Sequence, residues 1–125
     1  MRGFVAVGIG AALGAWTRWG LAAALNSVFP LLPLGTLAAN VIGGFAIGIA
    51  MESFGRSSGL SEELRLFVIT GFLGALTTFS TFSAEVVGLL QRAQYMWAMV
   101  LASSHLVGSL LATMLGIACV RWMSG

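Results

Sequence analysis

Long apolar stretches separated by short polar turns make up almost the whole of the 125-residue chain. A helix needs about 20 mainly apolar residues to cross the hydrocarbon core of a bilayer. Each stretch reaches that length, which predicts an all-α integral membrane protein with four transmembrane helices and a single membrane domain, residues 1–125. We expect the helices at about residues 3–25, 34–53, 64–90 and 95–122.

The centre of the third stretch carries residues that interrupt helices. Residues 71–78 read GFLGALTT, and two glycines followed by paired threonines predict a break in the helix near residues 74–78. A break frees backbone N–H and C=O groups that lipid cannot satisfy, so it is tolerated only against protein, a cavity or an ion. A continuous helix that uses its glycines for packing is equally consistent with these residues.

Small residues recur within the other three stretches. A spacing of four residues between small side chains lets two helix backbones approach closely. We therefore expect the first span, through Gly10 and Gly14, and the fourth span to pack tightly against a neighbouring helix. The stripe on the fourth span is Ser104, Gly108, Ala112 and Gly116, and the second span contains Gly44 and Gly48.

The composition excludes several classes of function. Hydrophobic residues make up 58% of the chain and charged residues only 8%, against about 25% charged in soluble domains, so there is no room for a soluble domain. The basic residues are all arginines and occur singly, so nucleic acid is not an expected partner. With one histidine, His105, and one cysteine, Cys119, a single chain cannot form a disulfide or a protein-only zinc site.

The arginines fix the orientation in the membrane only weakly. Four spans place both termini on the same side, which then carries four arginines against two on or near the other side. That difference is a weak positive-inside bias. The first group is Arg2, Arg56, Arg65 and Arg121, and the second is Arg92 and Arg18.

Few polar side chains lie within the spans, and those few are candidates for function because the bilayer penalises them. Asn40 follows Thr36 by one helical turn, and its amide supplies two N–H donors. The commoner role of such an asparagine is a hydrogen bond between helices. Arg18, near the end of the first span, either snorkels to the headgroups or supplies a positive charge that attracts anions to a vestibule.

Hydroxyls and phenylalanines are concentrated after the expected break, where residues 77–85 read TTFSTFSAE. On a helix, Phe79 and Phe82 share one face, and Ser80 and Ser83 share another. Two aromatic residues at this spacing are usually part of a core. Here, however, they lie among hydroxyls, which can replace water as donors, and aromatic ring edges carry partial positive charge. The combination suits a small, strongly hydrated anion.

Residues 71–85, GFLGALTTFSTFSAE, resemble the third-helix signature of the Fluc (CrcB) family of fluoride channels. Residues 14–19, GAWTRW, and 33–40, PLGTLAAN, resemble its first-helix and second-helix signatures. The resemblance covers nearly the whole chain in the same order. It implies a passive, electrogenic, fluoride-selective channel in the lipid bilayer of the inner (plasma) membrane, which exports cytoplasmic fluoride and gives fluoride resistance.

The resemblance also implies an antiparallel, dual-topology homodimer with two fluoride pores. A sodium ion at the dimer centre would be held by the backbone carbonyls of Gly74 and Thr77, and Arg18 would be the vestibule arginine. The pore residues implied in this way are Asn40, Phe79, Phe82, Ser80, Thr81, Ser83 and Ser109.

Three further residues, Thr36, Glu85 and His105, are candidates for a role in the pore or in gating. Some members of the family have a serine where His105 aligns and a tyrosine where Leu101 aligns. The row of hydroxyls along the implied pore therefore differs in this chain at the end formed by the fourth helix. A carboxylate beside an anion path repels the anion unless it is protonated, paired or turned away, and Glu85 presents that problem.

Three alternative functions account for fewer of these features. Small dual-topology multidrug exporters resemble one another in having a glutamate on the first helix for proton coupling. Residues 3–25 of this chain contain no glutamate. A non-conducting assembly subunit would account for the small-residue stripes but not for the hydroxyl-rich segment. A membrane enzyme is not expected, because the chain has no GxSxG or HExxH motif and no second carboxylate near Glu85.

Overall fold

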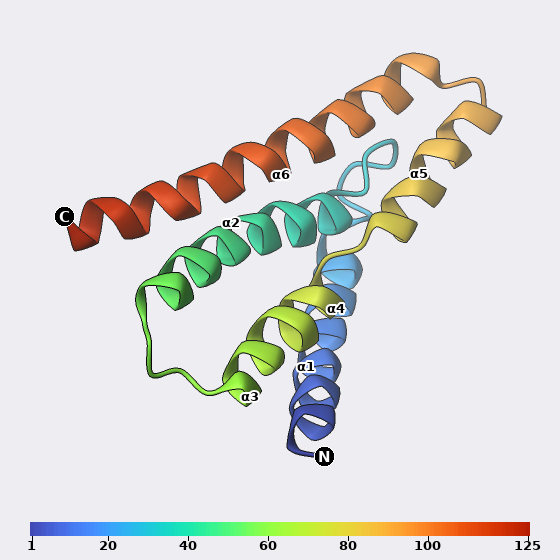
Figure 1. Ribbon diagram of the computed structural model, residues 1–125. Coiled ribbons are helices and arrows are strands. Elements are labelled where there is room, and N and C mark those ends of the chain that lie inside the picture. The colour runs from blue at the N-terminus through green and yellow to red at the C-terminus, as the bar shows by residue number, and fades with distance from the viewer.

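The structure, a computed structural model, describes all 125 residues and consists entirely of helices and their connections (Figure 1). Helices α1 (Arg2–Leu25), α2 (Leu34–Arg56) and α6 (Tyr95–Ser124) are continuous. The helix between α2 and α6 is composite, and all four are long and apolar enough to cross a membrane. The predicted all-α fold with four transmembrane helices is therefore confirmed. The parts of the composite helix are α3 (Glu62–Arg65), η1 (Leu66–Leu73), α4 (Gly74–Leu76) and α5 (Phe79–Gln91).

The predicted interruption of the third helix is present and lies between α4 and α5 (Figure 1). Thr77 and Thr78 have extended backbones, with φ and ψ of −87° and 155° and of −153° and 115°. Gly74 is helical, so the threonines and not the glycines form the break. The preceding segment η1 is a π-helix of eight residues, a geometry that usually occurs as a single turn near functional sites and that the sequence did not predict.

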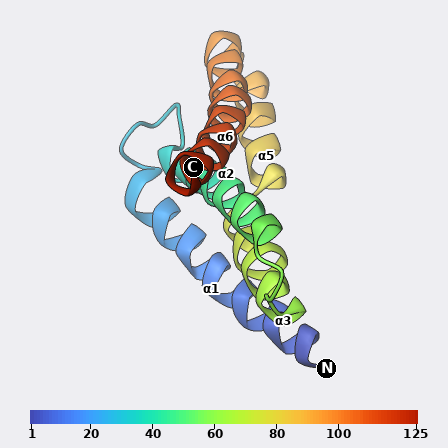
Figure 2. The same ribbon diagram turned by 60° about the vertical axis from the view of Figure 1, so that its left-hand side comes forward.

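Helix α1 runs alongside η1 and α4 at a distance that only glycines permit (Figures 1 and 2). A Cβ atom added to Gly10 would collide with the carbonyl oxygen of Phe67, and one added to Gly14 with that of Phe72. Gly71 on η1 is close-packed in the same way, since a Cβ atom added there would lie 2.8 Å from the Val7 carbonyl oxygen. The small-residue spacing of the first span is therefore a backbone-to-backbone contact.

Helices α2 and α6 form the second closely packed pair (Figures 1 and 2). A Cβ atom added to Gly48 would collide with the carbonyl oxygen of Thr113, and one added to Gly116 with that of Phe45. The hydroxyl of Thr113 lies 2.9 Å from the Gly44 carbonyl oxygen and adds an interhelical hydrogen bond. The packing face predicted for α6 thus lies against α2, where Gly48 contributes to the close approach.

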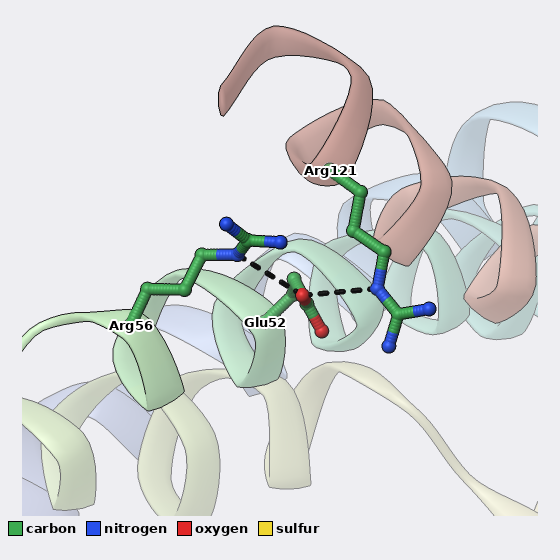
Figure 3. Close-up of polar contacts among 3 residues, drawn as sticks. All are labelled: Glu52, Arg56 and Arg121. Atoms are coloured by element: carbon green, nitrogen blue, oxygen red, sulfur yellow. Dashed lines mark hydrogen bonds and ion pairs between the residues drawn. The ribbon is translucent and has the colours of Figure 1, made fainter. Parts of the chain in front are cut away.

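An ion cluster joins the same two helices near the C-terminus (Figure 3). Glu52 Oε1 accepts from Nε of Arg56, one turn later on α2, and from Nε of Arg121 on α6, each at 3.0 Å. Both arginine side chains are largely exposed, so water and salt weaken these pairs. The cluster adds little to the tight glycine contacts beside it.

Only 18 of the 125 residues are buried, which is few even for a small protein. Leu89 and Leu101 are the largest side chains that are fully buried, whereas large apolar side chains along α1 and α6 are exposed. In a bilayer those side chains face lipid or another protein chain. Leu101, where some family members have a tyrosine, is thus part of an apolar core with Leu89 and Ala98.

We predict that Gly14→Ala destabilises the fold, because the added methyl group would push α1 away from η1 and α4. Overpacking of this kind typically costs about 1 to 3 kcal/mol. Gly8→Ala is the matched control on the same helix, since nothing lies within 4 Å of a Cβ atom at that position. Thermal unfolding of the two purified variants in detergent measures the difference. Equal stability of both would show that the close approach of α1 is not required.

Candidate functional site

A hollow of about 420 Å³ lies beside the break, between α2, the composite third helix and α6. Its wall is mainly apolar, with a small number of polar groups. Seven of the residues that the sequence predicts for the pore, for gating or for the sodium site line it, namely Asn40, Gly74, Thr77, Phe79, Phe82, His105 and Ser109. The remaining lining residues are Gly43, Gly44, Ile47, Ile69, Leu73, Thr78, Leu106 and Leu110.

Asn40 on α2 is hydrogen-bonded to the backbone of the break. Its Oδ1 accepts from the Thr78 N–H at 2.8 Å, and its Nδ2 donates to the Thr78 carbonyl at 3.0 Å. These are groups that an unbroken helix would have paired internally, and buried backbone groups need such partners. Asn40 therefore forms hydrogen bonds between helices, which is the commoner role of an asparagine in a membrane.

His105 on α6 lies next to this amide. Its Nδ1 is 3.0 Å from Asn40 Nδ2, and its side chain is only 3% exposed. The Phe82 ring lies against the imidazole, with the two ring centroids 4.5 Å apart and the planes inclined by 32°. The Nε2 atom of His105 has no hydrogen-bond partner within the chain.

The two phenylalanines of the hydroxyl-rich segment are adjacent on the first turn of α5. Their rings are 5.5 Å apart between centroids and meet edge to face at 68°. Phe79 is 77% exposed, whereas Phe82 is half-buried. Within one chain, therefore, Phe79 is not a core residue, and its ring lies at the open side of the hollow.

Thr78 caps α5, a role that sequence reasoning missed. Its Oγ1 accepts from the Thr81 N–H at 3.1 Å, and a threonine directly before a helix is a common N-cap. The Thr81 hydroxyl and the Ser80 hydroxyl lie 3.1 Å and 3.3 Å from the same oxygen. Ser80 is exposed, Thr81 and Ser83 are half-buried, and none of the three lines the hollow. Their part in a pore remains a prediction.

Glu85 is also separate from the hollow. Its Oε2 accepts from the Thr36 hydroxyl at 2.7 Å, and its Oε1 is buried without a partner. Together with Thr81 and Arg92, Glu85 lines a second cavity of about 280 Å³ near the 26–33 connection. Glu85 thus lies outside the hollow that Phe82 and His105 line, and one of its carboxylate oxygens is paired with the Thr36 hydroxyl.

Arg18 on α1 turns toward the break, so the alternative in which it snorkels to the headgroups is not the conformation observed. Its Nε donates to the Ala75 carbonyl at 2.9 Å. Ala75 belongs to the last turn of α4, where the break leaves carbonyls without helical partners. A cation at a helix C-terminus also interacts favourably with the helix dipole.

Not every carbonyl at the break has a partner. Those of Ala75 and Thr78 accept from Arg18 and Asn40, whereas the side chains and the turn and cap N–H groups donate to none of the carbonyls of Gly74, Leu76 and Thr77. Gly74 is exposed. Unpaired carbonyl oxygens are ligands that suit a hard cation, so the donor set at Gly74 and Thr77 fits the sodium ion that the family resemblance implies.

Comparison with known proteins places the chain in a family. It matches the family described as CrcB-like protein, Camphor Resistance (CrcB), over residues 5–117. A protein of Nitrosospira multiformis named fluoride-specific ion channel FluC is 61% identical to it, covering 95% of this chain and 93% of the relative. One of the same name from Pseudomonas putida is 52% identical over 100% of this chain and 98% of the relative. The chain therefore belongs to the CrcB family.

Proposed function

We propose that this chain is a fluoride-selective ion channel of the inner membrane, which lets cytoplasmic fluoride leave passively and carries net charge as it does so. The curated relatives bear the name of such a channel and match over nearly their full length. The observation that supports the proposal most directly is the pair of phenylalanine rings at a polar break inside the membrane. Export of this kind would protect a cell from fluoride.

The chemistry of the hollow suits a small anion that has lost its water. Fluoride is a strong hydrogen-bond acceptor and can leave its hydration shell only where other donors replace it. Hydroxyls such as that of Ser109 and the positive edges of Phe79 and Phe82 offer this without a fixed positive charge that would trap the ion. Chloride is larger and less strongly hydrated, and gains less from the same groups.

The first test measures both ions in one preparation. Liposomes containing the purified protein and loaded with potassium fluoride should release fluoride rapidly once valinomycin is added, because potassium must leave with the fluoride to keep the charge balanced. Parallel liposomes loaded with chloride should release almost none. Fluoride and chloride electrodes record the two fluxes, and protein-free liposomes are the control. An exporter would instead require a proton gradient, and an assembly subunit would release neither ion.

We predict that Phe82→Ile and Phe79→Ile abolish most fluoride release while the protein remains folded. Isoleucine keeps an apolar side chain of similar volume but has no positive ring edge, and such swaps in a core usually cost less than about 1.5 kcal/mol. Phe4→Ile is the control, since Phe4 is an exposed phenylalanine on α1 that does not line the hollow. If Phe82→Ile elutes like the wild-type protein on gel filtration and conducts equally fast, that ring is only a packing residue.

The functional unit in this proposal is an antiparallel homodimer in which the chain inserts in both orientations. Gly74 and Phe79 are exposed and the hollow is open in a single chain, so a second copy would supply the missing wall. Insertion in both orientations is consistent with the weak arginine bias. A sodium ion between the two breaks would be held by the carbonyls of Gly74 and Thr77, and its charge would stabilise carbonyl dipoles that face each other.

Chemical labelling tests this arrangement. In a Cys119→Ser background, a cysteine at Gly125 should react with an impermeant maleimide from both faces of the cell membrane, because half of the chains are inverted. Reaction from one face only would exclude dual topology.

The sodium ion is tested on the purified protein. Replacing sodium by N-methylglucamine should weaken the dimer on gel filtration, and an unchanged dimer would speak against the ion.

A further inference from the structure

The backbone at the break fixes which way the Asn40 amide points. The Thr78 N–H can only donate, so the atom that faces it at 2.8 Å is the amide oxygen. The Thr78 carbonyl can only accept, so the atom that faces it at 3.0 Å is the amide nitrogen. A flipped amide would place donor against donor and acceptor against acceptor. Asn40 therefore presents its second N–H, and not its oxygen, to His105.

This N–H in turn selects the tautomer of His105. The imidazole Nδ1 is 3.0 Å from Asn40 Nδ2 and must act as the acceptor of that hydrogen bond. In a neutral imidazole, one ring nitrogen accepts and the other carries the proton. The proton of His105 therefore lies on Nε2, and both N–H groups of Asn40 are already in use.

The Nε2–H of His105 is a buried donor for which the chain provides no acceptor. Native proteins rarely leave such a group unpaired, so an absence of this kind calls for a ligand or a water. His105 lines the hollow together with Phe82 and with Ser109, one helical turn further along α6. The other buried atom without a partner, Glu85 Oε1, is an acceptor and is not bonded to His105.

We propose that the His105 Nε2–H donates a hydrogen bond to the anion in transit, and that Asn40 is a positioning residue which holds the imidazole in the tautomer that can do so. The proposal rests on the fluoride conduction proposed above and identifies the donor at this level of the path. Nε2 is enclosed in the observed conformation. The Phe82 ring lies against the imidazole and lines the hollow together with it.

The decisive measurement is nitrogen NMR, because His105 is the only histidine in the chain. Protein labelled with ¹⁵N-histidine and shown to conduct fluoride is examined in liposomes with fluoride, with chloride and with neither. We expect the Nδ1 resonance in the unprotonated range and the Nε2 resonance in the protonated range, and a shift of Nε2 with fluoride alone. A proton on Nδ1, or an Nε2 resonance that ignores fluoride while the protein conducts, would overturn the proposal without affecting the channel function.

Variants separate the donor from the residue that positions it. His105→Leu removes the donor and should slow fluoride release at least about tenfold, the effect of losing one hydrogen bond to a charged group, whereas His105→Gln retains an N–H and should conduct better than His105→Leu. Ser104→Ala is the control on the same helix, since Ser104 bonds only to its own helix and does not line the hollow. Equal rates for His105→Leu and wild-type protein would contradict the proposal.

The positioning role has its own spectroscopic signature. Asn40→Asp places an acceptor opposite Nδ1, so the proton should move from Nε2 to Nδ1 and the two nitrogen resonances should exchange their ranges. The tautomer and not the flux carries this test, because an added carboxylate beside the path also repels the anion. An unchanged tautomer in a folded Asn40→Asp protein would show that the amide does not set it.

Discussion

A break in a transmembrane helix leaves backbone donors and acceptors that lipid cannot satisfy, and the polar side chains of this chain are arranged around that constraint. Asn40 bonds to both backbone groups of Thr78, and Arg18 bonds to the carbonyl of Ala75. The Thr78 hydroxyl caps the helix that resumes after the gap. Helices α1 and α2 and both halves of the third helix are therefore joined at or directly before the two residues of extended backbone.

Groups that hold the break together are not free to bind an anion. If Asn40 donated to a passing ion, the Thr78 carbonyl or the His105 nitrogen would lose its partner at each passage. If the anion instead accepts from the other nitrogen of the imidazole, as proposed above, this conflict does not arise, because the amide stays bonded to the backbone and to Nδ1. Structural and conducting roles then lie on successive hydrogen bonds and not on the same one.

The sequence predicted the features that depend on local composition. Apolar length identified the four spans, whereas the residues before Phe79 were equally consistent with an interrupted and a continuous helix, and the structure shows the interruption. It did not predict which partner each polar group has, because Asn40 and Thr78 are 38 residues apart and meet only through the lateral arrangement of the helices. Nothing in the apolar run of residues 66–73 distinguishes a π-helix from an α-helix. The capping role of Thr78 was recognisable from its position before a helix.

The polar geometry is in the end set by residues that have no polar side chain. The Asn40–His105 contact spans α2 and α6, and the separation of these helices is fixed where Gly48 and Gly116 lie against the backbone of the opposite helix. A hydrogen bond of 3.0 Å tolerates only a few tenths of an ångström of separation before it weakens. A methyl group added at either glycine requires a larger shift than that. The glycine contacts therefore hold the imidazole within reach of the amide that selects its tautomer.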